Sequence, residues 1–384
     1  MKKGNLVIAI YSPPEYYPPT LNAIECLSDE FKNIAIVFRN YSGKFDWEYP
    51  HGVRVLPVGK YIDVRKGENS SYARKIFYFL QYTKKLLTTV RKEDPEIIIL
   101  YDYMPILSIR LIWYFIKKPK ILWYHNHDVG DRSLLRKGSI SWFAWKSEKW
   151  IFPKLSFFSL PALERRPYFP FETLKGKFFY LPNYPSRKVI RRFKLQPKEL
   201  SGEVKLIFQG SIGPLHGFEE IIGILNEEID GRLLKLILKG SISDIYKGSL
   251  IKIAEKYGVS DRMVFLPQIS YSNVIRDAKN YHIGIGIYMK EDIMNRTMAT
   301  SSNKIYEYAA AGLPVLLYDN IHFRSHLDRY SWAFFTDCSA NSLKMSIKNI
   351  IQNYTQYSFQ AMTDFEKELN FENFFLPLVN FLKG

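Results

Sequence analysis

The sequence predicts an α/β protein of two doubly wound domains, each a parallel sheet with helices on both faces. Its 384 residues are too many for one compact core. Short apolar runs recur in two separate series along the chain, with helical patterns between several of them. The runs are continuous rather than alternating, as in strands that are buried on both faces. Ligands of such sheets bind at the carboxyl ends of the strands, so we expect the site in a cleft between the domains.

The first series of apolar runs lies between residues 6 and 124. Buried strands are expected at 6–10, 34–38, 97–100 and 121–124. Thr20 is the expected N-cap of a helix that follows the first strand. A longer amphipathic helix has an apolar face formed by Ile76, Phe79, Leu80, Leu86, Leu87 and Val90. Its opposite face is basic and carries Arg74, Lys75, Lys84, Lys85 and Arg91.

The second series begins after residue 200. Strands are expected at 206–208, 234–238, 263–265, 283–287 and 315–317. The proline- and charge-rich stretch 181–198 separates the two series. We therefore expect a first domain over 1–185 and a second over 186–360. The remaining residues, 361–384, are expected to form a C-terminal helix that could cross back to the first domain.

The positive charge of the chain is concentrated in its first half. Residues 1–190 hold 31 lysines and arginines against 17 aspartates and glutamates, whereas residues 191–384 hold 23 against 21. The two balances are +14 and +2, an asymmetry that solubility alone does not require. It favours an anionic partner, which could be a membrane surface, a phosphorylated lipid or nucleic acid.

Aromatic side chains accompany many of these cations, which suits either a membrane interface or stacking on nucleic-acid bases. No nucleic-acid recognition motif supports the latter, so we expect no nucleic-acid partner. The cations concerned are Lys117, Lys118, Arg136, Lys137, Arg165 and Arg166. The aromatic residues are Trp113, Tyr114, Phe115, Trp142, Phe143, Trp145 and Trp150.

Three features of the sequence favour a cytoplasmic protein. The two cysteines, Cys26 and Cys338, lie in different halves and suit a reducing compartment. The apolar run 6–10 is too short for a signal peptide. The later apolar stretch 97–116 contains Asp102 and Arg110 and is interrupted by Pro105, so no membrane span is expected.

The most informative segment is 301–315, which reads SSNKIYEYAAAGLPV. Ser302 is the expected N-cap of a short helix, Gly312 its end, and Pro314 prevents its continuation into the next strand. The free N–H groups of its first turn and the Lys304 ammonium form an anion site. Glu307, one turn later, can accept hydrogen bonds from vicinal hydroxyls such as those of a ribose. The alternative is a solvent-exposed i,i+3 pair of Lys304 and Glu307.

This segment resembles the donor-nucleotide motif of the retaining glycosyltransferases of family 4, which have the GT-B fold. The resemblance implies two Rossmann-like domains that face each other across a cleft. It implies that Glu307 binds the nucleoside ribose and that the backbone near Ser302, Asn303 and Lys304 meets the diphosphate. The match covers 181–318 well and the first half of the chain loosely.

Other segments agree with the family in their order along the chain. Residues 208–218 resemble the first strand and phosphate loop of the nucleotide domain, which implies donor binding by Gly210, Ser211, His216 and Gly217. Segments 238–240 and 265–267 resemble strands that border the base pocket, which implies contacts from Lys239 and Leu266. Segment 283–286 resembles the strand before the donor loop, and 181–183 the interdomain hinge.

The sequence also departs from the family at positions that bear on catalysis. Many members have an acidic residue eight positions before the ribose glutamate, where this chain has Ala299. Ser211 replaces a common arginine, and His216 replaces a common lysine. Two cations expected at the phosphates are therefore missing or weakened, although backbone N–H groups near Gly210 and Gly217 remain. The identity of the donor stays open.

A polar segment, YHNHD, follows the strand at 121–124. Its two histidines and aspartate are too few for a zinc site, which needs three or four ligands, so no metal is expected. One interpretation is a histidine whose hydrogen bonds are satisfied within the protein. The resemblance implies instead that a histidine after this strand touches the donor sugar, with His127 the first choice and His125 the second. We group Asp128 with them as the candidate catalytic residues.

The resemblance implies a hexosyltransferase that retains the anomeric configuration and needs no metal or other cofactor. In most proposals for this family, the leaving diphosphate assists attack by the acceptor on the same face of the sugar. We expect a UDP- or GDP-linked donor, a lipid-linked or surface-polysaccharide acceptor, and peripheral association with the inner face of the cell membrane. The alternatives are a nucleotide-sugar epimerase on the same fold and a non-catalytic protein that binds sugar nucleotides.

Overall fold

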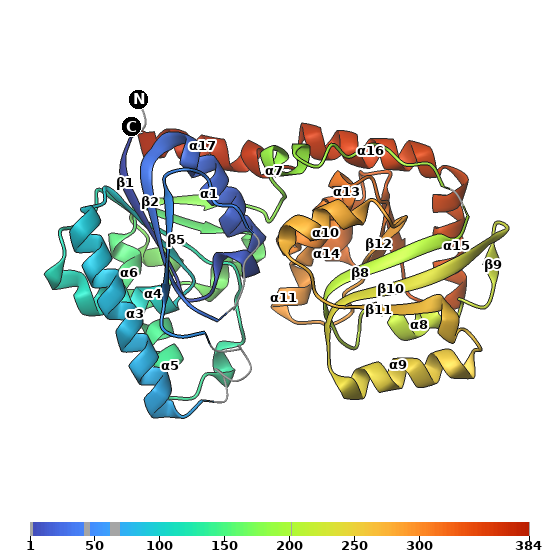
Figure 1. Ribbon diagram of the computed structural model, residues 1–384, viewed down its shortest axis with the longest axis horizontal. Coiled ribbons are helices and arrows are strands. Elements are labelled where there is room, and N and C mark those ends of the chain that lie inside the picture. Colours follow the sequence, from blue (N-terminus) through green and yellow to red (C-terminus); the bar gives the residue numbers. More distant parts are fainter. Residues whose placement is uncertain (1–2, 42–46, 62–69, 201, 384) are drawn as a thin grey trace. The chain divides into compact units, whose positions relative to one another are not determined.

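The computed structural model describes residues 3–41, 47–61, 70–200 and 202–383. The chain divides into two compact units (Figure 1). The first comprises Met1–Asn183 with Phe371–Gly384, and the second comprises Tyr184–Asn370. The expected boundary was at 185–186, and the expected C-terminal segment 361–384 is divided between the units. Helix α16 (Tyr354–Lys367) belongs to the second unit, whereas α17 (Phe371–Lys383) belongs to the first.

The sheet of the first unit has seven parallel strands in the order β3-β2-β1-β4-β5-β6-β7. They are β1 (Lys3–Ile10), β2 (Phe31–Arg39), β3 (Val53–Val58), β4 (Ile97–Tyr101), β5 (Ile121–His125), β6 (Phe157–Leu160) and β7 (Lys177–Tyr180). The four expected strands are confirmed as β1, β2, β4 and β5. The strand order reverses between β1 and β4, which is where doubly wound sheets bind ligands.

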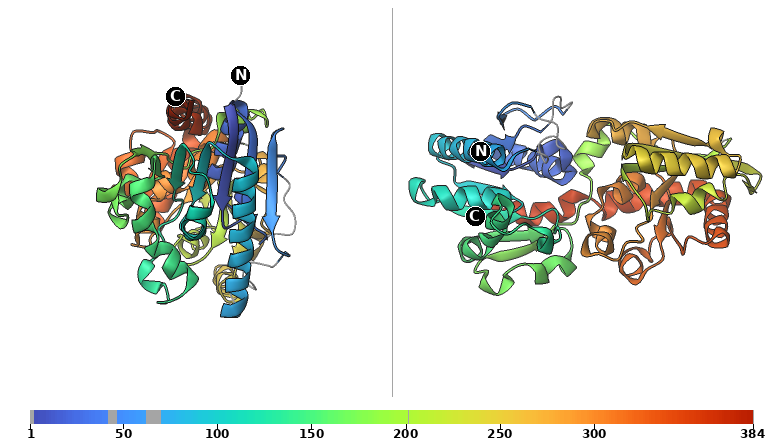
Figure 2. Two further views of the ribbon diagram at one scale, coloured as in Figure 1. Left: turned by 90° about the vertical axis from the view of Figure 1, so that its left-hand side faces the viewer. Right: turned by 90° about the horizontal axis from the view of Figure 1, so that it is seen from below.

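Helices cover both faces of this sheet (Figure 2). The α-helices are α1 (Pro18–Glu30), α3 (Tyr72–Glu93), α4 (Met104–Ile112), α5 (Ile140–Lys146) and α6 (Glu148–Ile151), with α17 beside α1. The 3₁₀ segments are η1 (Pro14–Tyr16), η2 (Trp113–Phe115), η3 (Arg132–Leu134), η4 (Phe152–Lys154), η5 (Leu163–Tyr168) and η6 (Phe171–Thr173). No helix in the described ranges combines the length and apolarity of a membrane span.

Two expectations about these helices need correction. Thr20 is not the N-cap of α1, because the helix begins at Pro18 and Tyr17 occupies the capping position. Proline suits the first helical position, since its φ is already helical and its missing N–H would be unpaired there. In α3 the expected basic face is exposed, and Phe79, Leu86 and Val90 are buried as expected. Leu80, expected on the apolar face, is 54% exposed.

The second unit has six strands in the order β11-β10-β8-β12-β13-β14, all parallel, and the short β9 (Glu228–Ile229) runs antiparallel to β10. The six are β8 (Val204–Ile212), β10 (Arg232–Ile242), β11 (Met263–Leu266), β12 (Ile283–Gly286), β13 (Val315–Tyr318) and β14 (Ala333–Thr336). The five expected strands are therefore confirmed, and only β9 and β14 were not predicted.

The described residues of the second unit contain ten α-helices and the 3₁₀ segment η7 (Ser260–Arg262). The α-helices are α7 (Arg187–Arg191), α8 (Phe218–Ile222), α9 (Asp244–Lys256), α10 (Tyr271–Ala278), α11 (Ile293–Arg296), α12 (Met298–Ser301), α13 (Asn303–Ala310), α14 (Ile321–Leu327), α15 (Ala340–Gln352) and α16. Apolar side chains of β8, β10 and β12 join those of α8 and α15 in one hydrophobic core.

Two glycines allow α13 to pack closely on β12. A Cβ atom on Gly284 would lie 2.2 Å from the ring of Tyr308, and one on Gly286 would lie 2.8 Å from Leu317 and 3.2 Å from Ile305. The Gly-x-Gly pattern of this strand therefore has a packing role. It seats the helix that carries Lys304 and Glu307 directly against the sheet.

Candidate functional site

Helix α13 has the start and end that its sequence predicts. It runs from Asn303 to Ala310, and Gly312 adopts a left-handed φ of +71° just beyond its end. The N–H of Leu313 closes the end by donating to the Tyr308 carbonyl over 2.9 Å. Ser302 occupies the N-cap position, but its hydroxyl does not cap the helix and instead lies 3.2 Å from the Tyr288 hydroxyl. The first-turn N–H groups are therefore not used by that side chain.

Glu307 is buried rather than exposed, so the interpretation as an exposed pair with Lys304 is wrong. Its side chain is 4% accessible to solvent. One carboxylate oxygen accepts a hydrogen bond of 3.1 Å from Nε2 of Gln209. Burial raises the pKa of Glu307 to about 7, against the opposing effects of the Lys304 charge and the Gln209 bond. A carboxylate can accept about four hydrogen bonds, so most of its capacity is left for a ligand.

Lys304 lies one turn before Glu307 and beside the end of β8. Its Nζ is 4.0 Å from the ring centroid of Phe208 and 5.4 Å from that of Tyr288. A Cβ atom on Gly210 would lie 2.9 Å from the same Nζ. Gly210 also has a φ of +132°. A Cβ atom on Gly240 would overlap the carbonyl oxygen of Gly210, so the two strands approach closely at this point. These glycines leave room for the ammonium at the carboxyl edge of the sheet.

Gln209 links this carboxylate to a second group of predicted residues. It is paired in register with Lys239 of β10, which is paired in turn with Leu266 of β11. One row across three neighbouring strands therefore contains Leu266, Lys239 and Gln209. At the end of this row, the Gln209 side chain donates its hydrogen bond to Glu307. Gln209 was not predicted as a site residue from the sequence. Its position directly before Gly210, at the end of a buried strand, is the signal that could have identified it.

A cavity of about 430 Å³ opens beside this row. Its walls include Lys239, Leu266, Pro267, Arg276, Asp277 and Tyr281. Lys239 is buried and forms an ion pair with Asp277, which also accepts a hydrogen bond of 2.8 Å from the Tyr281 hydroxyl. Burial lowers the pKa of Lys239 to about 8. The two residues assigned by resemblance to the base pocket thus line one cavity.

The end of β8 and the loop after it contain the other predicted donor residues. Ser211 is exposed, and Gly217 adopts a φ of +72° at the start of α8. His216 is held by its own loop, because Nδ1 lies 3.0 Å from the Gly213 carbonyl and the ring stacks on Phe218. Burial lowers the pKa of His216, so the residue does not replace the cation that the family has at this position.

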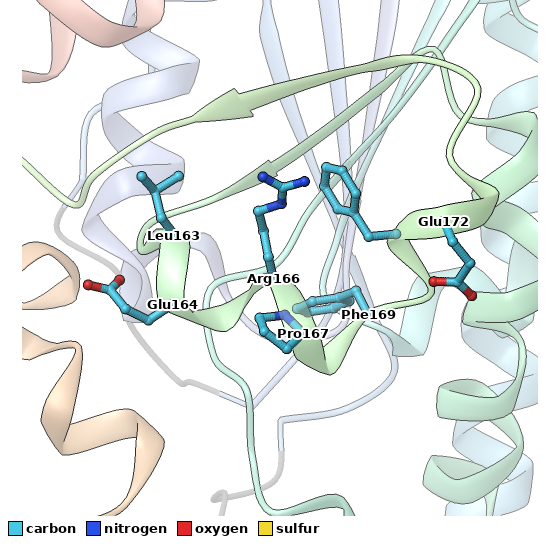
Figure 3. A pocket seen from close by; sticks show the side chains of 7 residues that line it. Leu163, Glu164, Arg166, Pro167, Phe169 and Glu172 are labelled. Atoms are coloured by element: carbon cyan, nitrogen blue, oxygen red, sulfur yellow. The ribbon is translucent and has the colours of Figure 1, made fainter.

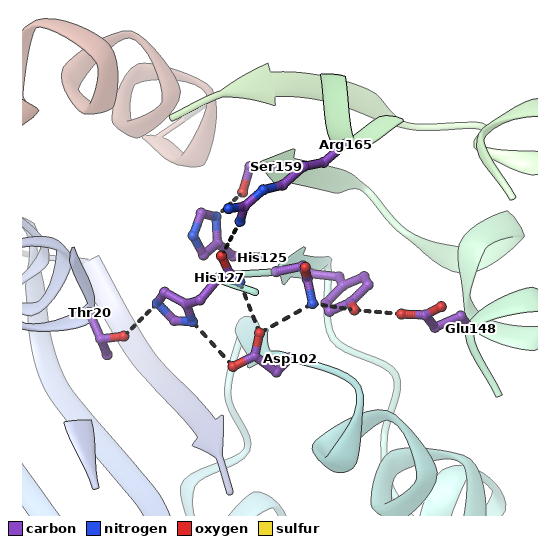
Figure 4. A network of polar contacts seen from close by, with 9 residues as sticks. Thr20, Asp102, His125, His127, Glu148, Ser159 and Arg165 are labelled. Carbon is purple, nitrogen blue, oxygen red and sulfur yellow. Dashed lines mark hydrogen bonds and ion pairs between the residues drawn. The ribbon is translucent and has the colours of Figure 1, made fainter. Parts of the chain in front are cut away.

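In the first unit, Asp102 organises the segment that follows β5 (Figure 4). Asp102 follows β4 and has a φ of +61°. Its carboxylate accepts hydrogen bonds from the backbone N–H of His127 over 2.9 Å and from Nδ2 of Asn126 over 3.2 Å, and its second oxygen lies 3.3 Å from Nδ1 of His127. Arg165 donates to the His127 carbonyl from the other side.

His127 is enclosed, and both of its ring nitrogens have partners. The ring stacks between Tyr17 and Tyr101, with centroid separations of 4.6 and 4.9 Å. Nε2 lies 3.0 Å from the Thr20 hydroxyl. Donation from Nδ1 to Asp102 leaves Nε2 as the acceptor for that hydroxyl, so the surroundings fix one tautomer and one ring orientation.

The other two candidate catalytic residues, His125 and Asp128, differ in their burial and in their surroundings. His125 is 3% exposed, and its Nδ1 lies 2.8 Å from the Ser159 hydroxyl, which also accepts from Nε1 of Trp123. Burial holds the pKa of His125 well below its usual range, with the nearby His127 and Arg165 acting in the same direction. Asp128 is exposed. Among the described residues, no group of three His, Cys, Asp or Glu side chains is placed to hold a metal ion.

Four residues around His127 were not predicted from the sequence: Thr20 as a side-chain partner, Tyr17, Tyr101 and Asp102. Asp102 directly follows a buried strand, as His125 ends the next one, and this shared placement was the available signal. Arg165 was counted among the cations expected to meet an anionic partner. It is instead fully buried, because its guanidinium anchors η5 to the His127 carbonyl.

No protein-family model and no curated protein sequence matches the chain. Solved structures match it over almost its whole length. Sucrose-phosphate synthase from Thermosynechococcus elongatus is 11% identical, with 99% of this chain and 98% of that chain covered and a TM-score of 0.65. HepE from Anabaena in complex with UDP-glucose is 13% identical, with 99% and 100% covered and a TM-score of 0.60.

A third match is a Listeria monocytogenes protein assigned as a UDP-N-acetylglucosamine 2-epimerase. It is 10% identical, with 97% of this chain and 92% of that chain covered and a TM-score of 0.53. Identities this low establish a common fold and leave the activity open. The fold class is thereby confirmed as GT-B, with two Rossmann-like α/β units.

Proposed function

We propose that the protein is a glycosyltransferase that moves a hexosyl group, with retention, from a UDP- or GDP-linked donor to a lipid-linked or surface-polysaccharide acceptor. The observation that carries the proposal is the buried carboxylate of Glu307 at the carboxyl edge of the second unit's sheet. Gln209 occupies one acceptor position of this carboxylate, and the others suit two vicinal ribose hydroxyls. Lys304, one turn before it, suits the diphosphate that follows the ribose in any such donor.

The other contacts proposed for the donor lie along the same carboxyl edge of the second unit's sheet. The base would enter the cavity beside Lys239 and Leu266, which is next to Glu307 through the row of paired strands. The diphosphate would lie near the end of β8 at Gly210 and Ser211 and near the following loop with His216 and Gly217. It would also lie near the start of α13 at Ser302 and Asn303. Backbone N–H groups there and the Lys304 ammonium can stabilise its charge.

The proposed reaction breaks the bond between the anomeric carbon and the diphosphate oxygen. A new bond forms between that carbon and an acceptor hydroxyl oxygen on the same face of the sugar. The acceptor proton passes to the leaving diphosphate oxygen. The protein then acts by positioning and by charge stabilisation, so that neither an enzymic nucleophile nor a metal is required. The His127 segment is proposed to contact the transferred sugar.

The direct test is a thermal-shift panel of nucleoside diphosphates and nucleotide sugars. A ligand present at 100 times its Kd stabilises the folded protein by about 2.7 kcal/mol. We expect UDP or GDP, and a sugar nucleotide with the same base, to raise the melting temperature, while adenosine diphosphate does not. A panel in which no uridine or guanosine diphosphate shifts the transition would contradict the donor proposal.

Sugar transfer is expected to persist in EDTA. Lys304 and backbone N–H groups are proposed to stabilise the diphosphate charge, which in other transferases falls to a bound metal. The measurement is the initial rate of donor turnover with EDTA, with added Mg²⁺ and with added Mn²⁺. Loss of turnover in EDTA that either ion restores would contradict this account of charge stabilisation.

His127→Ala is expected to lower turnover by about tenfold to a hundredfold while leaving the nucleotide Kd unchanged. The enclosed ring is proposed to position the segment that contacts the sugar in the transition state, and no contact of this segment with the nucleoside is proposed. His125→Ala should have a milder effect on turnover. Both histidines are buried, so each variant is assayed well below its own melting temperature. A larger loss in His125→Ala would reverse our choice between the two residues.

The epimerase is the second candidate function, favoured by the structural match to a protein assigned that activity. An epimerase would turn over the sugar nucleotide without any acceptor, whereas the transferase requires one. A non-catalytic protein is the third candidate, because Ala299, Ser211 and His216 replace residues common in the family. Nucleotide binding without turnover across a panel of acceptors would favour it.

We also propose that the protein is cytoplasmic and docks peripherally on the anionic inner face of the cell membrane. The basic first unit supports this proposal, since its charge would hold the protein where a lipid-linked acceptor is presented.

A further inference from the structure

Glu148 is a buried carboxylate that the proposed reaction does not use. It is the first residue of α6 and is 1% exposed. One of its oxygens accepts a hydrogen bond of 2.8 Å from the Tyr124 hydroxyl, and the other lies 3.0 Å from Nη2 of Arg132. In Figure 4, polar contacts run from His127 through Asp102 to Glu148. The carboxylate is therefore joined to the segment that is proposed to contact the transferred sugar.

The hydrogen bonds between Glu148 and this segment have fixed directions. The Tyr124 hydroxyl donates its one proton to Glu148, so its oxygen is left to accept from Nδ2 of Asn126 over 3.3 Å. The same Nδ2 donates to Asp102 over 3.2 Å, and Asp102 accepts from the backbone N–H of His127 over 2.9 Å. An ionised carboxylate only accepts hydrogen bonds. Ionised Glu148 thus keeps the Asn126 amide turned with its N–H groups toward Tyr124 and Asp102.

Arg132 connects Glu148 to the loop at 129–135, which directly follows the candidate catalytic residues. It is the first residue of η3 within that loop. Nη1 of its guanidinium donates to the Tyr168 carbonyl, and the guanidinium carbon lies 4.7 Å from the ring centroid of Phe169. These two residues end η5, the segment that Figure 3 shows beside a cavity of about 670 Å³. One guanidinium therefore holds the loop against both α6 and η5.

The charged and titratable groups around Glu148 come from several elements. Those facing it are Tyr124 from β5, Arg132 from η3, and Asp102 and Tyr103 from the segment between β4 and α4. Arg110 of α4 donates instead to the Ser147 hydroxyl over 3.2 Å, and the lysines of α5 and η4, Lys146 and Lys154, lie over tryptophan rings. Burial raises the pKa of Glu148 to about 7, against the opposing effects of the Arg132 charge and the Tyr124 bond.

We propose that Glu148 is a positioning residue, which holds the 129–135 loop and the His127 segment when it is ionised and releases them when it is protonated. Protonated Glu148 loses its ion pair with Arg132. Its proton can also be donated to the Tyr124 oxygen, which turns the Tyr124 O–H toward the amide N–H of Asn126. The inference rests on the proposed function, because it assigns a pH-dependent control to the segment that is proposed to contact the transferred sugar.

The test follows the loop directly by fluorine NMR. Leu134 lies in this loop and is 80% exposed, whereas Cys26 and Cys338 are buried, so a trifluoromethyl thiol reagent labels Leu134→Cys selectively. Spectra are recorded from pH 5 to pH 9 without ligand. We expect one transition with a midpoint near pH 7, and none when Glu148→Gln is added, which should show the low-pH spectrum throughout. Glu255→Gln, an exposed glutamate of α9, is the control and should keep the transition.

A second variant and a rate measurement complete the test. Arg132→Gln removes the same ion pair from its partly exposed side, so it serves even if Glu148→Gln does not fold, and it should also show the low-pH spectrum up to pH 8. At saturating donor, wild-type turnover should rise about tenfold from pH 6 to pH 8, as the ionised fraction of Glu148 does. Glu148→Gln should stay at the low value, with the nucleotide Kd unchanged.

Two outcomes would overturn the role of Glu148. One is a wild-type label spectrum that does not change between pH 5 and pH 9. The other is a transition that persists in Glu148→Gln or in Arg132→Gln with its midpoint unaltered, because another group would then control the loop. Failure of the proposed function is distinguishable from both. The loop would then respond to pH as expected in a protein that binds neither UDP nor GDP.

Discussion

Replacing Glu307 by glutamine is expected to weaken binding of the nucleoside diphosphate by about tenfold, and Glu307→Ala by about a hundredfold. One carboxylate that serves two ribose hydroxyls makes charge-assisted hydrogen bonds of about 1.5–3 kcal/mol each. Glutamine keeps an acceptor oxygen but loses the charge, and alanine loses both. Calorimetry with UDP and GDP measures the change, and Glu228→Gln, an exposed glutamate of β9, is the control. An unchanged Kd in Glu307→Ala would remove the ribose assignment.

The same substitution should change the dependence of stability on pH. The folded-state pKa of Glu307 is about 7, above the ordinary value of 4.5. The stability associated with a raised pKa is present below pH 4.5 and is lost as the pH rises through 7. Above pH 7 the buried charge therefore costs on the order of 3 kcal/mol, which Glu307→Gln removes. We expect the variant to gain stability relative to the wild type between pH 5 and pH 8.

The changes in nucleotide affinity and in pH-dependent stability together distinguish a binding role of Glu307 from a purely structural one. A glutamate that only stabilised the fold would cost stability when replaced and would leave nucleotide affinity unaffected. Wild-type affinity should also fall as the pH drops below about 7, because protonated Glu307 loses its charge, and Glu307→Gln should lack this dependence. A stability difference between the two proteins that is constant from pH 5 to pH 8 would contradict the burial argument.

All but one of the strands predicted from the sequence are apolar runs in the middle of a sheet, and the exception is the edge strand β11. One inner strand, the buried four-residue β6, was not predicted. The unpredicted strands at the sheet edges are short or partly exposed. β3 has a half-exposed pattern and contains Pro57, and β7 and β14 have four residues each. Such segments lack the continuous apolar run that marks a strand covered on both faces. Tertiary pairing, not local sequence, places them in the sheets.

The residues of the candidate site also fall into two groups, those predicted from the sequence and those that were not. Glu307 and Lys304 were identified because they lie in one short helix whose start and end are predicted by the adjacent residues. The partners of these residues come from distant parts of the chain. Gln209 reaches Glu307 across 98 positions, and Thr20 reaches His127 across 107. Only the strand order and register bring such pairs together, so a single sequence could not supply them.

The first unit is expected to bind anionic vesicles and not neutral ones. The tip formed by η2 exposes Tyr114 by 89% and Phe115 by 61%, and Lys118 places its ammonium 4.0 Å from the ring centroid of Trp113. The basic face of α3 is joined to this tip, because Nε of Arg91 donates to the Phe115 carbonyl over 2.9 Å. Lys117 and Lys120 beside the tip form ion pairs with Asp94 and Glu96, so the positive charge of this surface comes from Lys118 and the basic face of α3. Exposed aromatic side chains with cations near them suit binding at the surface of an anionic leaflet.

Replacing Lys84, Lys85 and Arg91 together by glutamine should release the protein from those vesicles. Each cation near an anionic surface contributes about 1 kcal/mol, so the three together change the partition about a hundredfold. The measurement is sedimentation with phosphatidylserine-containing and with pure phosphatidylcholine vesicles, at rising salt, which should weaken binding by screening. The control is the glutamine triple variant at Lys252, Lys256 and Lys348, exposed lysines of the second unit with the same change in net charge. If the control variant dissociates as readily, binding follows net charge and not this surface. If the wild type sediments equally with both vesicle types, the basic first unit serves a soluble anion or solubility instead.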